Sequence, residues 1–320
     1  MFGTYRTLLT IAVLLDHYAG LGISSAPGVF GFLCLSGFLM TMLMDGPYKR
    51  RSGAFLLNRF LRIYPPYWFA FGLTVALFSV PAGLHLAGNL ALFPYTDFLI
   101  PITWWVANEF VFYFLIGFGI SRTLWRTAVW AGGSAVIVIA ALLTIPASLT
   151  SFYFSLWCAS VPFSFGALAY HLRDKIILPT FPVLPFAVVG VIASMLIGGI
   201  AHFSFGRDDL LLAAIYVSLV PHAAIILVLF RMRSSSTDEL IGRFSYPMYL
   251  LQMLGFMIVT YKFNMERVSS LTLAGATLLV TVALSGILIA LVDVPTQIVR
   301  TRVKNGVSFI PFRRSQSTTS

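Results

Sequence analysis

Residues 182–202 read PVLPFAVVGVIASMLIGGIAH, a run of 21 residues without an Asp, Glu, Lys or Arg side chain. An α-helix of this length spans about 30 Å, which is the thickness of the hydrocarbon core of a bilayer. The whole chain has the same character, because 58% of its 320 residues are hydrophobic, only 10% are charged and the mean hydropathy is +0.90. A soluble domain would carry about 25% charged residues, so lipid must be the solvent for much of this protein.

Outward from this run, hydropathy predicts further spans of similar length on both sides. The predicted spans are 5–23, 28–45, 64–81, 104–121, 127–145, 152–171, 182–202, 209–230, 245–262 and 270–292. The predicted fold is therefore all-α, a polytopic membrane bundle of about ten transmembrane helices within residues 1–299. Residues 300–320 are basic and then rich in Ser and Thr, which predicts a disordered cytoplasmic tail.

The basic residues predict how the bundle is oriented. If the N-terminus is cytoplasmic and the spans alternate, only Arg207, Lys262 and Arg267 fall outside. The other 18 of the 21 Lys and Arg residues fall in segments on the cytoplasmic side. This asymmetry follows the positive-inside rule and favours ten spans with both termini in the cytoplasm.

Charge and cysteine content narrow the range of partners. The net charge is +10, but the basic residues form short clusters between apolar runs. Such clusters are typical of loops that meet an anionic membrane surface, so we expect membrane lipid and not nucleic acid as a partner. Cys34 and Cys158 both lie in apolar runs, which predicts neither a disulfide framework nor a metal site. The oligomeric state is not set by these patterns.

The first span carries Arg6 and His17, eleven positions apart. At about 100° per residue their side chains project from one face, about 16 Å apart along the helix. Histidine is well suited to move a proton near neutral pH, so His17 is a candidate catalytic base. Asp16 points about 100° away and is expected to serve another helix or a polar pocket. The structural alternative is an arginine at the membrane interface and a histidine hydrogen-bonded between helices.

A second ionisable residue, Glu109, lies in the aromatic stretch WWVANEFVFY of residues 104–113. Trp105, Glu109 and Tyr113 share one helical face at i, i+4 and i+8. A carboxylate inside a membrane needs a partner, and we expect His17 or an arginine. The structural alternative is an ion pair that holds two helices together.

Arg59 and Arg62 stand three residues apart, shortly before Pro65 and Pro66. The prolines can begin a span, since the first helical residue has no amide hydrogen to satisfy. Two guanidiniums at a cytoplasmic entrance suit a phosphate-rich ligand, and the positive-inside distribution explains them equally well.

The remaining polar residues of interest carry weaker signals. Gly37 predicts close packing of two helices, and no nucleophile motif surrounds its neighbour Ser36. The histidines near span ends are predicted to be structural, namely His85, His171, His202 and His222. From these residues, two functions remain open: an enzyme with a histidine base, or a proton-coupled transporter or flippase in which Asp16, His17 and Glu109 relay protons.

Five elements in order along the spans resemble the acyltransferase-3 family of membrane acyltransferases, which includes O-acetylases of lipopolysaccharide and exopolysaccharide. The elements are the pair Arg6 and His17, then GFLCLSGFL at 31–39, RFLRIYPPYW at 59–68, the stretch 104–113 with Glu109, and FSYPMYL at 244–250. The chain departs from the family at two places. Gln252 stands where the family often has a histidine, and Asp293 replaces the glutamate of the more usual Glu-x-Pro near the end.

The resemblance implies transfer of an acyl group from cytoplasmic acyl-CoA, often acetyl-CoA, to a hydroxyl at the far face of a bacterial inner membrane. The expected acceptor is a polysaccharide or a lipid-linked saccharide. His17, Arg6 and Glu109 would be catalytic, and Arg59 and Arg62 would bind the CoA donor. No metal is implied.

Overall fold

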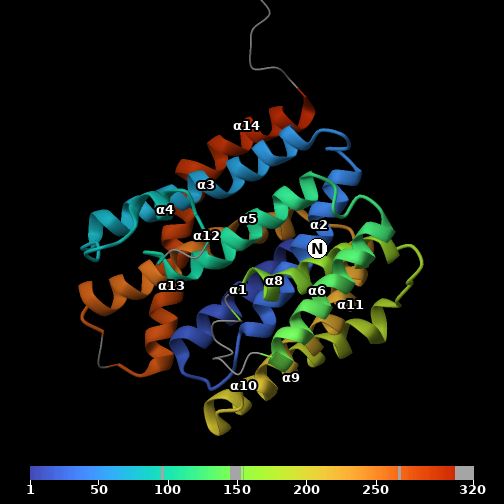
Figure 1. The fold of residues 1–320 in the computed structure, drawn as a ribbon. Coiled ribbons are helices and arrows are strands. Elements are labelled where there is room, and N and C mark those ends of the chain that lie inside the picture. The colour runs from blue at the N-terminus through green and yellow to red at the C-terminus, as the bar shows by residue number, and fades with distance from the viewer. Residues whose placement is uncertain (95–96, 145–152, 154, 266–267, 307–320) are drawn as a thin grey trace, which may run out of the picture.

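The computed structural model describes residues 1–94, 97–144, 153, 155–265 and 268–306, and the regular elements among them are helices (Figure 1). The α-helices are α1 (Phe2–Ala19), α2 (Ala26–Asp45), α3 (Ser52–Leu77), α4 (Leu86–Leu90), α5 (Trp104–Gly117), α6 (Leu124–Thr144), α8 (Leu156–Leu172), α9 (Thr180–Phe205), α10 (Asp208–Val217), α11 (Leu219–Arg231), α12 (Ser236–Met257), α13 (Ser270–Leu288) and α14 (Val294–Asn305). A 3₁₀ turn, Pro101–Thr103, precedes α5, and π-helical turns at Ile258–Lys262 and Ile289–Asp293 flank α13.

Each of the ten predicted spans coincides with a helix or with two consecutive helices, which confirms the all-α membrane bundle. Five stretches of the described chain are long and apolar enough to cross a membrane, namely Ala26–Asp45, Leu124–Ala141, Thr180–Phe205, Asp208–Arg231 and Ser270–Asn305. The helices at the other predicted spans are shorter or carry ionisable side chains, as α1 does with Arg6 and Asp16. The cytoplasmic placement of both termini stays a prediction.

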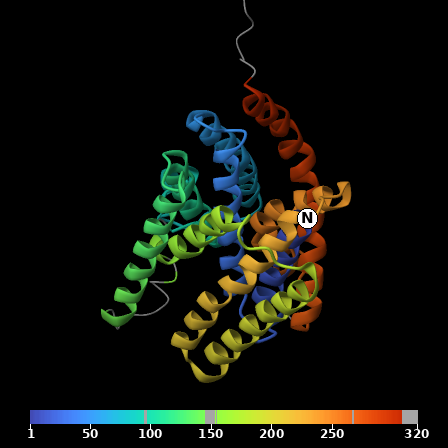
Figure 2. The ribbon, with the colours of Figure 1, turned by 90° about the vertical axis from the view of Figure 1, so that its right-hand side faces the viewer.

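Helix α2 forms the centre of the bundle. Most of its residues are buried, and it packs chiefly on α8 and α11, with further contacts to α1 and α5. Around this core, α6 (green) and α13 with α14 (orange to red) lie at opposite edges (Figure 2). The two halves of the sequence therefore meet around α2.

Two glycines allow α2 and α8 to touch backbone to backbone. A methyl group at Gly37 would overlap the carbonyl oxygen of Phe163, and one at Gly166 would overlap the carbonyl oxygen of Cys34. The close packing predicted for Gly37 is thus confirmed. Small residues bring helix backbones together in membranes, where dispersion contacts replace the hydrophobic effect as the force between helices.

The first turn of α1 is held by a carboxylate from α12. Asp238 is 4% exposed and accepts hydrogen bonds from the amides of Gly3 and Thr4 at 3.2 and 2.8 Å. The hydroxyls of Thr4 and Ser234 also donate to it, at 2.8 and 2.9 Å. Asp238 therefore satisfies amides that no residue of α1 itself can satisfy and fixes where α1 begins against α12.

Helix α3 differs from its predicted extent. It begins at Ser52 and continues unbroken through Pro65 and Pro66, whereas a span was predicted to begin at residue 64. The prolines remove two amide donors from the helix interior. The carbonyls that lose their donors are those of Leu61 and Arg62. The hydroxyl of Tyr246 of α12 donates to the next carbonyl oxygen, that of Ile63, at 3.0 Å. Helix α3 is thus in contact with α12 beside the prolines, where the sequence predicts the start of a span.

Helix α14 also extends beyond the predicted boundary at residue 299. Residues 300–305 are helical and run beside α3 (Figure 1), so this part of the predicted tail is ordered. The physical reason is a set of hydrogen bonds from α3 and from Arg51, the residue before it. Asn58 donates to the carbonyl oxygen of Arg300 at 2.9 Å, and Arg51 donates to those of Val303 and Lys304. Residues 307–320 lie outside the described part of the chain.

Candidate functional site

A pocket with about 860 Å³ of space, including its open mouth, lies among helices α1, α2, α3, α5 and α12. Four of the five predicted site residues line it: Arg6, Arg59, Arg62 and Glu109. These residues are far apart in the sequence and meet because α1 packs against α2 and α12, while α5 packs against α2 and α3.

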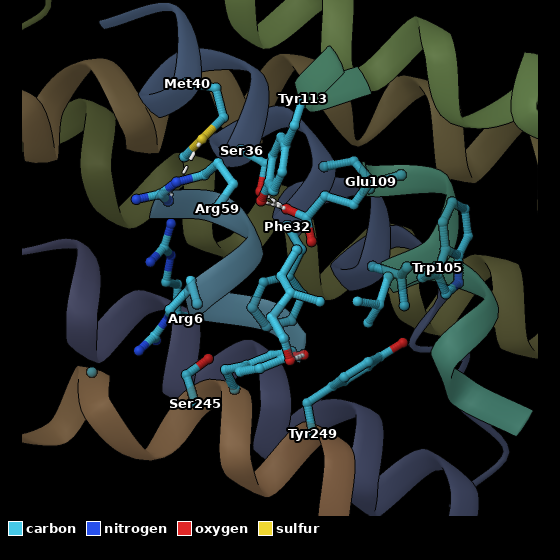
Figure 3. A pocket seen from close by; sticks show the side chains of 17 residues that line it. Arg6, Phe32, Ser36, Met40, Arg59, Trp105, Glu109, Tyr113, Ser245 and Tyr249 are labelled. Atoms are coloured by element: carbon cyan, nitrogen blue, oxygen red, sulfur yellow. Dashed lines mark hydrogen bonds between the residues drawn. The ribbon is translucent and has the colours of Figure 1, made fainter. Parts of the chain in front are cut away.

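The pocket has a cationic side and an aromatic side. Arg6 and Arg59 lie together on one side, whereas Trp105 and Tyr249 lie on the opposite side, with Phe32 between them (Figure 3). Tyr249 is held in place by its hydroxyl, which donates to the carbonyl oxygen of Ile102 at 2.8 Å. A ligand that fills the pocket would therefore meet positive charge at one end and aromatic rings at the other.

The guanidiniums of α3 have different surroundings. Arg62 donates to Asp293 at 2.8 Å, and Asp293 is only 4% exposed. Arg59 donates to the side-chain oxygen of Asn58 at 2.7 Å, while its buried Nε has no hydrogen-bond partner among the described residues. Arg62 is thus neutralised by a carboxylate, and Arg59 retains donor capacity for a ligand.

Glu109 is paired with hydroxyl groups. Ser36 Oγ and Tyr113 OH both donate to Glu109 Oε1, the latter at 2.5 Å (Figure 3). The predicted partner, His17 or an arginine, is therefore wrong for direct contact, because α5 faces α2 and presents Glu109 to Ser36. The shared face of Trp105, Glu109 and Tyr113 is confirmed, since all three line the pocket.

His17 lies outside the pocket. It stands on the last turn of α1, its side chain is exposed, and it lies beside Gln252 of α12. Of the two residues predicted to project from one face of α1, only Arg6 lines the pocket. Periodicity places both on one face of α1, but the pocket does not extend over the three turns that separate them. Gln252 is one turn beyond Tyr249 on α12, about 4.5 Å along the axis, so His17 is near the aromatic end of the pocket.

Asp16 serves another helix, as predicted. Its Oδ2 accepts from the amide and the hydroxyl of Ser25 at 2.7 and 2.6 Å, which caps the start of α2. Asp16 thus contributes to helix packing beside His17.

The other histidines have protein partners. His85 accepts from the amide of Gly88, His171 contacts the carbonyl oxygen of Ser121, and His202 contacts Asp208. The fully buried His222 lies between Tyr5 OH and the carbonyl oxygen of Pro27. Within the described residues, no group of three or more His, Cys, Asp or Glu side chains could hold a metal ion.

Ser36 and Asn58 are the site residues that sequence reasoning missed. Ser36 interrupts an apolar run and adjoins Gly37, so a polar residue beside a helix-packing glycine was the available signal. No pattern in the sequence pointed to Asn58, because its amide nitrogen donates to the carbonyl oxygen of Arg300, which lies more than 200 residues away.

Comparison with known families gave one match. A family model described as an acyltransferase domain, of the acyltransferase-3 type, matches residues 4–290. No curated protein and no solved structure matched the chain. The match spans the pocket helices α1, α2, α3, α5 and α12, and it covers well over half of the sequence. The chain therefore belongs to the acyltransferase-3 family and is a multi-pass membrane O-acyltransferase with an acyl donor and an acyl acceptor.

Proposed function

We propose that this enzyme transfers an acyl group, acetyl in the simplest case, from cytoplasmic acyl-CoA to a hydroxyl of a polysaccharide or lipid-linked saccharide at the opposite face of a bacterial inner membrane. One observation carries the proposal: a pocket inside a membrane bundle has guanidiniums on one side and aromatic rings on the other. Acyl-CoA has the matching polarity, with phosphates at one end and an acyl thioester at the other.

The cationic side would bind the phosphates of the donor. Guanidiniums hold phosphate oxygens through charge-assisted and often bidentate hydrogen bonds. Arg59 has an unused buried donor, and Arg6 lines the same side of the pocket. The thioester end would then point toward Phe32, Trp105 and Tyr249.

His17 would act on the acceptor. It is exposed and lies beside Gln252, one helical turn from Tyr249 at the aromatic end of the pocket, so an acceptor hydroxyl can approach it from outside the pocket. His17 would take the hydroxyl proton while the hydroxyl oxygen attacks the thioester carbonyl, or it would carry the acyl group briefly itself. In the direct route, His17 would then pass that proton to the leaving CoA thiolate. Glu109 lies on the donor side and would balance the arginine charges there.

This separation of roles predicts separable kinetic defects. In purified enzyme with labelled acetyl-CoA, His17→Ala should lower the rate of acyl transfer about 100-fold or more while leaving the affinity for CoA unchanged. Arg59→Gln should raise the KM for the donor with less effect on kcat. His202→Ala, which removes another exposed imidazole, is the matched control and should transfer normally.

Two results would contradict the proposal. Full acyl transfer by a correctly inserted His17→Ala variant would exclude the assigned base. A wild-type protein that neither transfers nor hydrolyses the acyl group of acetyl-CoA would exclude the assigned donor. The acceptor would be identified by mass spectrometry of surface glycans from cells with and without the protein, where a difference of one acyl mass is expected.

A further inference from the structure

Beside the cationic side of the pocket, α14 brings a third arginine to the two on α3. Arg300 is 15% exposed, and its Nη1 lies 3.7 Å from Asp293 Oδ1, beyond hydrogen-bonding distance. It interacts electrostatically with Arg59 and Arg62 as well as with Asp293. Arg62 and Arg300 thus share one carboxylate, Asp293, and Arg59 lies within electrostatic range of both arginines.

The donor groups of this cluster are incompletely used. Within the described part of the chain, Nε and Nη1 of Arg300 and Nε of Arg59 are buried and have no hydrogen-bond partner. Buried polar groups are normally satisfied, and a buried charge without a partner is costly. Because Asp293 already pairs closely with Arg62 at 2.8 Å, the missing acceptors and negative charge belong with Arg59 and Arg300.

Asn58 is hydrogen-bonded to both of these arginines. Its side-chain oxygen accepts from Arg59 Nη2 at 2.7 Å, and its amide nitrogen donates to the carbonyl oxygen of Arg300 at 2.9 Å. Asn58 is 4% exposed, so water does not compete strongly for these bonds. The side chain of Arg59 and the backbone of Arg300 are therefore tied to one residue before any ligand binds.

We propose that Arg59 and Arg300 together bind a phosphate of the donor nucleotide, so that α14 completes the donor site. Arg62, which is paired with Asp293, has a structural role and does not bind the donor. A phosphate group supplies both the negative charge and the several acceptor oxygens that this pair lacks. The inference rests on the proposed function, because it takes CoA as the donor. The sequence predicts instead that Arg59 and Arg62 bind the donor, without a contribution from α14.

Binding of three ligands to the purified full-length protein tests the inference: CoA, 3′-dephospho-CoA and pantetheine, which has no phosphate. Arg300→Gln should weaken CoA binding by roughly 10- to 100-fold, the effect of losing a charged hydrogen-bond pair. Arg302→Gln, which removes an exposed guanidinium two residues along the same helix, should change it less than about 2-fold. Arg300→Lys keeps the charge without the planar donor pair and should fall between Arg300→Gln and the wild type.

The ligand series distinguishes the possible phosphates. If Arg300 binds the 3′-phosphate, the Arg300→Gln defect disappears with 3′-dephospho-CoA; if it binds the diphosphate, the defect persists. Either result supports the inference, provided that pantetheine binding is the same in variant and wild type. Wild-type affinity for CoA in both Arg300 variants would overturn it and leave the proposed function standing. Failure of the wild-type protein to bind CoA would overturn both.

Discussion

At the scale of single residues, the pocket is a set of ionisable side chains with unlike neighbours. Arg62 pairs with a carboxylate, and Glu109 accepts hydrogen bonds from two hydroxyls. Arg59 donates to the side-chain amide oxygen of Asn58 and has further donors available. These differences follow from which helix faces which, and they give each residue a distinct response to substitution.

Glu109 provides the negative charge on the donor side of the pocket. Glu109→Gln keeps a carbonyl oxygen for Ser36 and Tyr113 but removes the charge near Arg6 and Arg59, so we expect the variant to fold and its kcat for acyl transfer to fall about 10- to 100-fold. Ser36→Ala removes one hydrogen bond and should cost less, about 5-fold. Steady-state kinetics with acetyl-CoA measures both, and equal activity in Glu109→Gln and wild type would contradict this role.

Arg59 and Arg62 lie before a predicted span and were predicted because two guanidiniums at a cytoplasmic entrance suit a phosphate-rich ligand. Arg6 and Glu109 were predicted because ionisable groups in apolar runs are costly and therefore mark a site. His17 was placed with them for the same reason, but helical periodicity gives the direction of a side chain and not the extent of a cavity. The pairing of Ser36 with Glu109 depends on the packing of α2 against α5, which no local pattern encodes. Ionisable residues could thus be predicted, and their neutral partners could not.

At the scale of helices, the contact between α2 and α8 depends on glycine. Gly166→Ala should destabilise the protein by about 1–3 kcal/mol or more, because the added methyl group meets a backbone carbonyl that cannot rotate away. Gly132→Ala is the matched control, since a methyl group there meets no atom within 4 Å and should be neutral or slightly stabilising. Thermal unfolding in detergent compares the two, and equal midpoints would contradict the packing argument.

The cap that Asp238 provides for α1 predicts a pH dependence of stability. Asp238 lies before the span predicted to begin at residue 245. Burial acts to raise the pKa of its carboxyl, but hydrogen bonds from Thr4, Ser234 and Gly3 outweigh burial and lower the pKa to about 2. An ordinary Asp has a pKa of about 3.9, so the carboxylate stabilises the folded protein above about pH 4, and this contribution is lost as the pH falls toward 2.

The variant Asp238→Asn should therefore be less stable than wild type at neutral pH, by about 1–3 kcal/mol, and the difference should shrink below pH 4. The neighbouring Glu239→Gln is the control, because Glu239 is exposed. Thermal unfolding at several pH values measures the difference. A constant gap between Asp238→Asn and wild type from pH 7 to pH 2 would contradict the assigned pKa.

Local patterns succeeded where an element is governed by its own residues and failed where another element intervenes. The charge-free run at 182–202 falls within α9, and Gly37 lies at a helix contact, as expected. The prolines of α3 and the boundary at residue 299 were misjudged for one reason. Tyr246 of α12 donates to the backbone of α3 beside the prolines, and Asn58 of α3 and the preceding Arg51 donate to the end of α14, through hydrogen bonds between segments far apart in the sequence.

At the scale of the whole molecule, the distribution of basic residues predicts orientation. With Cys34 and Cys158 replaced by Ser, Arg207→Cys should react with a membrane-impermeant maleimide in intact cells, and Arg302→Cys should react only after the membrane is opened. Both positions are exposed, so access to the label reports the side of the membrane. The reverse labelling pattern would show that the bundle has the opposite orientation, with the cationic side of the pocket facing away from cytoplasmic CoA.

The glycine contacts between α2 and α8 have a consequence for the pocket that α2 lines. Cys34 and Gly37 sit on either side of Ser36, and both are pressed against the backbone of α8. Ser36 therefore has little freedom to follow an incoming ligand, and neither has the carboxylate that its hydroxyl holds. The donor would meet a cavity whose shape already exists, so little of its binding energy would be consumed in reorganising the protein.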